Sequence, residues 1–209
     1  PVIILIMLIA FSVHEFAHAW TAWKFGDDTA YREGRVTLNP LAHLDWIGML
    51  FLVIAGFGWA NPVPVRRSRF KNPRQMSIIV TLAGPVSNLL LAFLLLLLVD
   101  LLRVFHVFDN ASGDLMSNII IFILYWISIN LALFLFNLLP IPPLDGYRII
   151  EDLAPTRVRI KMAQYEQWGI FVFLLIVFIP VLSRYTIQPL FNLGGDIIYE
   201  LSKFVANFI

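Results

Sequence analysis

Residues 89–99 read LLLAFLLLLLV. They form the centre of a longer apolar run over residues 76–102. About 20 consecutive apolar residues allow a helix to cross the hydrocarbon core of a bilayer. This run is apolar around the whole helix circumference, as is typical of helices that face lipid or lie inside a bundle. The sequence therefore predicts a transmembrane helix here.

Three further runs have the same character, over residues 1–23, 115–139 and, more briefly, 168–182. The composition agrees with them, since 59% of the residues are hydrophobic and the mean hydropathy is +0.80. Only 14% are charged, against about 25% in a soluble globular domain. A soluble fold of 209 residues cannot cover such a chain with polar surface. The composition excludes a soluble enzyme and predicts an all-α integral membrane protein with about four transmembrane helices.

Other classes of function are excluded by what the chain lacks. It contains no cysteine, which excludes disulfides, thiol catalysis and zinc bound by cysteine. Its net charge is +1, and no stripe of Lys and Arg with interleaved aromatic residues occurs, so nucleic acid is not an expected partner. We expect one domain over residues 1–209, with its core in 1–150.

Two apolar segments do not read as ordinary spans. Residues 46–59 are 14 residues long and contain three glycines, which is typical of a re-entrant or interfacial segment rather than a span. Residues 187–209 place apolar side chains on one helical face and polar ones on the other. This pattern predicts an amphipathic helix in the membrane interface. A terminal helix packed against the bundle is the alternative.

Loop charges predict the orientation of the spans, because short loops rich in Lys and Arg stay in the cytoplasm. Residues 61–75 carry five basic side chains and no acid, and residues 140–161 carry four basic side chains. Residues 103–115 carry one arginine against two aspartates. The helix over 76–102 is therefore expected to run outward from the cytoplasm, and the helix over 115–139 to return.

The first apolar run contains His14-Glu15-Phe16-Ala17-His18, an H-E-x-x-H pattern. Residues four apart share one face of a helix, so both imidazoles can reach a single metal ion. Glu15 lies beside that face, where it can hold a metal-bound water and take its proton. Ionisable residues inside a membrane helix are costly and usually functional. This favours a metal site over the alternative of two interfacial histidines with a neighbouring acid.

Catalytic zinc normally has three protein ligands and an open position for water. A third ligand has to come from elsewhere in the chain, and the candidates are His43, Asp45, His106, Asp145, Glu151 and Asp152. His18 lies six residues before Lys24, about 9 Å from the end of the first span. Its partner must lie at a similar depth on the same side, which disfavours His106.

Asp145 meets this demand. It follows the span over 115–139 after a proline-rich link at 140–143, and Gly146 next to it permits a tight turn. A plain loop with a surface aspartate is the alternative. If residues 46–59 crossed the bilayer, the two histidines would enter from the face away from Asp145. The metal hypothesis therefore predicts that 46–59 is re-entrant.

The chain resembles the site-2 protease family of intramembrane zinc metalloproteases over about residues 10–150. The matching motifs occur in family order: HEFAH at 14–18, NPLAHLD at 39–45, GWANPVPV at 58–65, GPVSN at 84–88 and NLLPIPPLDG at 137–146. The chain is most similar to the minimal-core branch, because the loop over 103–115 leaves no room for a PDZ domain.

The resemblance implies one zinc ion per chain, held by His14, His18 and Asp145, with Glu15 as general base and later proton donor. The implied reaction is hydrolysis of peptide bonds by a zinc-activated water, within or near transmembrane segments of other proteins. The expected partners are transmembrane protein or peptide substrates and membrane lipid. The expected site opens toward the cytoplasm.

Asn88 is the candidate for a further catalytic role, because it is an amide in an otherwise apolar helix. It could stabilise the oxyanion of the reaction or grip the substrate backbone. A hydrogen bond between helices is the alternative. His43 and Asp45 are candidates for orienting a ligand, with hydrogen bonds in a loop or a first helical turn as the alternative.

A helical substrate hides its peptide bonds and must unwind before they can be attacked. Addition to the edge of a strand would hold the extended form by backbone hydrogen bonds. Residues 31–38 have strand character, and the prolines of 60–65 suit an edge strand. We expect one or both segments to form a short β-hairpin or loop beside the metal.

A different class of function uses the same residues. In a metal-ion transporter or channel, His14, His18 and Asp145 would line a permeation path. Glu15 distinguishes the two hypotheses, because a hydrolase needs a base beside the metal water and a transport site does not.

Overall fold

The long helices of the computed structural model match the apolar runs of the sequence. The structure describes residues 2–55, 58–106 and 113–206, and the four long helices in these ranges are α1 (Val2–Lys24), α5 (Pro73–Val104), α6 (Gly113–Asn137) and α8 (Thr156–Phe178). Each contains a stretch long and apolar enough to cross a membrane. The expectation of about four transmembrane helices in an all-α protein is confirmed.

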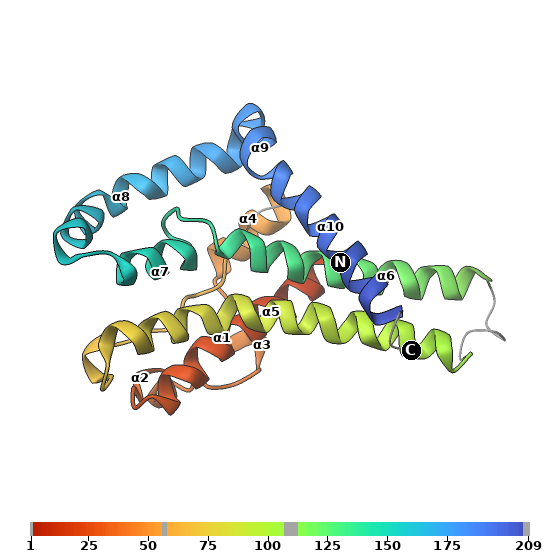
Figure 1. Cartoon of the computed structure of the whole chain (residues 1–209), viewed down its shortest axis with the longest axis horizontal. Helices are drawn as coiled ribbons and strands as arrows, with labels where there is room; N and C mark the ends of the chain where they lie inside the picture. The colour runs from red at the N-terminus through yellow and green to blue at the C-terminus, as the bar shows by residue number, and fades with distance from the viewer. Residues whose placement is uncertain (1, 56–57, 107–112, 207–209) are drawn as a thin grey trace.

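The centre of the structure is an antiparallel pair formed by α5 and α6, with α1 lying along the first half of α5 (Figure 1). Buried aliphatic residues join the pair, and they are Ala92, Leu96 and Val99 of α5 with Ile123 and Ile127 of α6. On α1 the completely buried residues include Ala10, Ala19 and Ala22. Small side chains let two helix backbones approach closely inside a membrane. Close packing of α1 on α5 therefore fixes the helix that carries the H-E-x-x-H pattern.

The fourth span begins and ends earlier than predicted, because α8 covers Thr156–Phe178 rather than residues 168–182. Its first turns carry Arg157, Arg159 and Lys161. These charged residues lower the local hydropathy, so that hydropathy alone does not predict a helix there. Pro180 explains the end, since a proline disfavours helical conformation in the residue before it. The chain continues as the short helix α9 (Pro180–Thr186).

Short elements connect α1 to α5: α2 (Thr29–Arg32), α3 (Pro40–His43), α4 (Trp46–Ala55) and the 3-10 turn η1 (Arg67–Arg69). Helix α4 has 10 residues and is about 15 Å long, half the thickness of a bilayer core. A Cβ atom on Gly48 would lie 2.2 Å from the carbonyl oxygen of Trp59. The chain after α4 thus returns to the first turn of α4, and the glycine permits that contact.

The prediction of a β-hairpin beside the site is wrong, because the described residues contain no strand. In residues 31–38 the chain leaves α2 in a tight turn, closed by a hydrogen bond from the Arg35 amide to the Ala30 carbonyl at 2.8 Å. Gly34 has a φ of 68° there, which interrupts an extended run. Residues 60–65 form neither helix nor strand, and Pro62 and Pro64 have no N–H to donate to a ladder. This second segment takes the loop form.

The C-terminal part contains α7 (Asp145–Leu153) and α10 (Gln188–Ala206) besides α8 and α9. Helix α10 crosses α6 (Figure 1). The Cβ position of Gly194 lies 3.6 Å from a methyl carbon of Leu135 and 3.8 Å from one of Leu131. The terminal helix is thus packed against the bundle, and its place in a membrane interface stays a prediction.

Candidate metal centre

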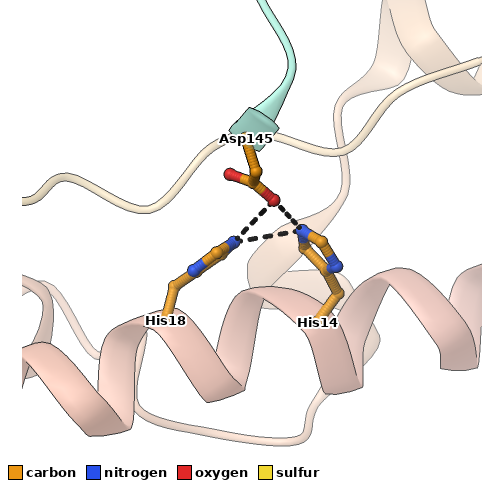
Figure 2. Close-up of side chains that lie close together, drawn as sticks. All are labelled: His14, His18 and Asp145. Carbon is orange, nitrogen blue, oxygen red and sulfur yellow. Dashed lines mark hydrogen bonds and ion pairs between the residues drawn. The ribbon is translucent and has the colours of Figure 1, made fainter. Parts of the chain in front are cut away.

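Three predicted side chains converge where α1, α5 and α7 meet. Figure 2 shows His14 and His18 on successive turns of α1 with Asp145 facing both rings. The two Nε2 atoms are 3.0 Å apart. Oδ2 of Asp145 lies 3.1 Å from Nε2 of His14 and 3.4 Å from Nε2 of His18. The structure therefore brings together side chains that lie far apart in the sequence.

Asp145 reaches this place because the chain breaks and restarts just before it. Helix α6 ends at Asn137, the proline-rich link follows, and Asp145 opens α7. A Cβ atom on Gly146 would lie 2.2 Å from the carbonyl oxygen of Leu138. Only glycine fits this approach between the start of α7 and the end of the preceding turn. Gly146 thus holds the aspartate close to the end of the span.

Hydrogen bonds on the far side of each ring decide which nitrogen faces the centre. Nδ1 of His18 lies 2.7 Å from the carbonyl oxygen of Val80, which can only accept. Nδ1 of His14 lies 2.8 Å from Oδ1 of Asn88. Each Nδ1 therefore carries a hydrogen, and in a neutral imidazole the Nε2 atom then presents a lone pair.

The orientation of the Asn88 amide follows from two backbone carbonyls. Asn130 donates from Nδ2 to the Trp126 carbonyl at 3.0 Å, which leaves its Oδ1 as an acceptor. Asn88 donates from Nδ2 to that oxygen at 3.0 Å and to the Ala10 carbonyl at 3.2 Å. Its own Oδ1 must then face His14 and accept from it. A chain of amides thus extends from α6 through α5 to the first histidine.

This arrangement could hold a cation at its centre. Two lone pairs 3.0 Å apart repel each other, and Oδ2 of Asp145 is buried without a hydrogen-bond partner. Ligands about 2.0–2.1 Å from a tetrahedral zinc lie about 3.3 Å from one another. The distances of 3.0, 3.1 and 3.4 Å and the N, N, O donor set fit zinc.

Gly84 of α5 makes room for the two rings. A Cβ atom at this position would lie 2.3 Å from Nε2 of His18 and 2.7 Å from Nε2 of His14. Any side chain there would occupy the space of the donor atoms. The sequence motif GPVSN at 84–88 therefore contributes a gap at its first residue and an orienting amide at its last.

Glu15 faces a different part of the chain from the two histidines. Its Oε2 accepts a hydrogen bond from the backbone N–H of Val63 at 2.9 Å, and its side chain is half-buried. The residues around Val63 are held in turn by two hydrogen bonds of Asn61. Its amide N–H donates to the His43 carbonyl at 2.9 Å, and its carbonyl accepts from Arg35. The loop over 60–65 thus lies beside the predicted base.

The other candidate residues have different partners. His43 donates from Nε2 to the Thr37 carbonyl at 2.8 Å, and burial lowers its pKa. Asp45 accepts from the Gly48 amide at 2.8 Å in the first turn of α4. Both fit the alternative of loop and first-turn hydrogen bonds. His106 follows the far end of α5, about 30 Å along the helix from Gly84. Glu151 and Asp152 pair with Arg67.

Sequence reasoning missed three contributors to the site. Asn130 is a second amide inside an apolar run, so the reasoning applied to Asn88 would also have found it. Gly84 belongs to the motif GPVSN, but the sequence does not show that the missing side chain of this glycine makes room for other groups. The carbonyl of Val80 cannot be assigned from residue type, because every residue has one.

Comparison with known proteins agrees with this geometry. A family model described as Peptidase family M50 matches residues 2–119 and 100–180. YwhC of Bacillus subtilis is 49% identical over 201 residues, which cover 96% of this chain and 90% of the relative. Rip2 of Mycolicibacterium smegmatis is 36% identical over 85% of this chain and 67% of the relative. MJ0611 of Methanocaldococcus jannaschii is 30% identical over 71% of each.

All three relatives carry the printed name "Putative zinc metalloprotease". No solved structure matches the chain. The matches decide between the two functional hypotheses in favour of the hydrolase. The chain belongs to peptidase family M50, the family of site-2 proteases, and it is a multi-pass membrane zinc metalloprotease.

Proposed function

We propose that the protein hydrolyses peptide bonds within or near the transmembrane segments of other membrane proteins. His14, His18 and Asp145 would hold the zinc ion, and Glu15 would act on the attacking water. The main support for this proposal is the position of three donor atoms. The Nε2 atoms of His14 and His18 lie on the apolar helix α1, and the Oδ2 atom of Asp145, which has no hydrogen-bond partner, lies next to them. Zinc bound there would acidify a water molecule and polarise the scissile carbonyl.

The protein groups have separate tasks in this reaction. Asn88 and the Val80 carbonyl hold a hydrogen on each Nδ1 atom and orient the rings so that the Nε2 atoms face the centre. Glu15 takes the proton of the attacking water and delivers it to the nitrogen of the leaving amine. The Asn88 amide hydrogens are both donated to protein oxygens, which favours an orienting role for Asn88 over contact with the oxyanion.

The depth of the site supports a membrane substrate. His18 precedes the last residue of α1 by six positions, or about 9 Å. We infer that the basic loop over 61–75 and the chain around Lys24 lie on the cytoplasmic side, so that the site opens there. The return of the chain from α4 to Gly48 supports a re-entrant segment with both ends on that side.

The loop over 60–65 is the proposed guide for the unwound substrate. The backbone N–H of Val63 in this loop donates a hydrogen bond to Glu15. A substrate strand aligned beside this loop would bring its backbone to the base and the metal. We take residues 1–209 as one metalloprotease domain whose core, residues 1–150, contains every residue of this site.

The test uses purified protein in detergent or lipid discs, with a fluorescent single-span substrate. We expect one zinc per chain in the wild type and in Glu15→Gln, but cleavage in the wild type alone. Asp145→Ala should lose both zinc and cleavage. A Glu15→Gln variant that still cleaves, or an Asp145→Ala variant with full zinc content, would refute the proposed roles.

A further inference from the structure

Arg67 differs from the other basic residues of the loop over 61–75. Its side chain is 27% exposed and turns toward α7, where Nη1 donates to Oδ1 of Asp152 at 2.7 Å. Its Nη2 donates to Oε2 of Glu151 at 3.2 Å. Arg74, by comparison, is exposed and donates to the Thr156 hydroxyl. Arg67 is therefore part of the folded structure rather than of a solvated basic patch.

The two acids that Arg67 contacts are buried. The side chain of Asp152 is 1% exposed and that of Glu151 is 8% exposed. Glu151 also lies 3.5 Å from Arg148 and 4.0 Å from Arg159. Among the residues that the structure describes, Asp152 pairs with Arg67 alone. Because a buried carboxylate is costly without a cation, Asp152 holds α7 to Arg67.

The contact acts on the same face of α7 that carries the metal-facing aspartate. Asp145 and Asp152 are seven residues apart, which is two helical turns. Their side chains therefore project in nearly the same direction. Helix α7 packs on α5, and the contact of Asp152 with Arg67 restrains the rotation of α7 about its axis. Asp145 moves with any such rotation.

On the other side, Arg67 is anchored to α1 through its own loop. The N–H of Val63 binds Glu15 at 2.9 Å. The N–H of Arg66 binds Asp27 at 2.5 Å, just beyond the end of α1. The chain that carries Arg67 is thus tied to the helix of the two histidines at two points. Arg67 joins that helix to the helix of the aspartate.

We propose that Arg67 is a positioning residue for the metal centre, which keeps Asp145 within reach of His14 and His18. This inference rests on the proposed function, because it takes these three side chains as the zinc ligands. It assigns to Arg67 no contact with substrate or metal. Its effect passes through Asp152 and α7 to the carboxylate of Asp145.

The experiment compares zinc affinity, measured by competition with a chelating dye, in the full chain and its variants. Arg67→Gln should bind zinc at least about tenfold more weakly, within the range for residues that orient ligands, and excess zinc should restore most of the cleavage. Arg67→Lys should lie between Arg67→Gln and the wild type. The visible spectrum of the cobalt-substituted protein should lose intensity in Arg67→Gln as the tetrahedral site opens.

Two control variants separate positioning from general stability. Arg74→Gln removes a nearby arginine, and Ile127→Ala destabilises the core between α5 and α6. Both should keep wild-type zinc affinity. Equal affinity in Arg67→Gln and wild type would overturn the proposal, and so would an equal loss in Ile127→Ala.

A double variant covers the case in which Arg67→Gln does not fold. Arg67→Gln with Asp152→Asn removes the buried unpaired charge and should fold, but its zinc affinity should stay low. Wild-type affinity in the double variant would mean that Arg67 only neutralises Asp152, and positioning would be refuted. If Asp145→Ala binds zinc as tightly as the wild type, the proposed function fails whatever Arg67 does.

Discussion

The backbone N–H of Val63 lies 2.9 Å from the carboxylate of Glu15, although 48 positions separate them in the sequence. A charge-assisted hydrogen bond of this kind fixes the direction in which a carboxylate points. The loop over 60–65 therefore does more than border the site. It holds the residue that we propose as the base.

Removing this hydrogen bond is the first prediction. Val63→Pro eliminates the N–H, whereas Val63→Ala keeps it and changes only the side chain. Since a hydrogen bond to a charged group contributes about 1.5–3 kcal/mol, we expect kcat to fall about tenfold or more in Val63→Pro. Zinc content should not change. A higher kcat in Val63→Pro would show instead that the loop restrains the base.

The gap at Gly84 gives a second prediction. Gly84→Ala places a methyl group 2.3 Å from Nε2 of His18, so the rings must move and zinc content should fall well below one per chain. Gly195→Ala is the matched control, because nothing lies within 4 Å of its Cβ position. Metal analysis of the two purified variants makes the comparison. Full zinc content in Gly84→Ala would contradict the role of this gap.

The amide chain behind His14 gives a third. Asn88→Ala removes the acceptor for Nδ1 of His14, and loss of such a partner costs about 10–100-fold in metal affinity. Asn130→Ala removes a group one step further away and should cost less. If Asn88 instead contacted the oxyanion, Asn88→Ala would lower kcat and leave zinc affinity unchanged. Titration with a chelating dye and steady-state kinetics distinguish the two outcomes.

Stability should depend on pH through His43. Burial lowers the pKa of His43 from 6.5, its hydrogen bond to Thr37 opposes this, and the charge of Arg35 lowers the pKa further. As pH falls through 6.5, the unfolded chain takes up a proton that the folded chain does not. The folded state therefore loses stability as the pH falls.

The measurement is the melting temperature on either side of the ordinary histidine pKa, at about pH 7.5 and about pH 5.5, in wild type and His43→Gln. A glutamine at this position would keep a donor for the Thr37 carbonyl but cannot titrate. The melting temperature should fall less between the two pH values in the variant. Any effect of the zinc ligands is common to both proteins and cancels in the comparison. An equal fall in both would contradict the prediction.

The orientation of the chain can be tested directly, because the protein contains no cysteine. Single cysteines at Trp46 and Lys71 should react with an impermeant thiol reagent applied from the cytoplasmic side. A cysteine at His106 should react only from the opposite side. Labelling of positions 46 and 71 from opposite sides would mean that residues 46–59 cross the bilayer.

Some parts of the structure follow from sequence patterns because each pattern has one physical cause. The apolar runs predict the helices α1, α5 and α6, since length and hydropathy alone decide whether a helix can span a membrane. The spacing of His14 and His18 predicts a shared face. The sequence also predicts that Asp145 approaches that face, because His18 lies at a known depth in the first span and the proline-rich link ends the helix before Asp145.

Other parts depend on tertiary contacts that no local pattern records. Hydropathy does not predict the beginning of α8, because the first half of this helix carries charged residues and only the second half is apolar. The segment over 31–38 has strand-forming residues, but the turn after α2 takes precedence over them. Arg67 cannot be told from Arg66 or Arg69 by composition, because what distinguishes it is the burial of Asp152, a residue of a distant helix.

The three converging side chains are divided between α1 and α7, which bears on when during synthesis the proposed zinc site could form. A ribosome makes the two histidines first and the aspartate only after two further apolar helices have been synthesised. A partly made or truncated chain would carry two imidazoles and the base without the third donor. If these side chains bind the zinc as we propose, nascent protein could not hydrolyse a substrate before the chain is made as far as Asp145.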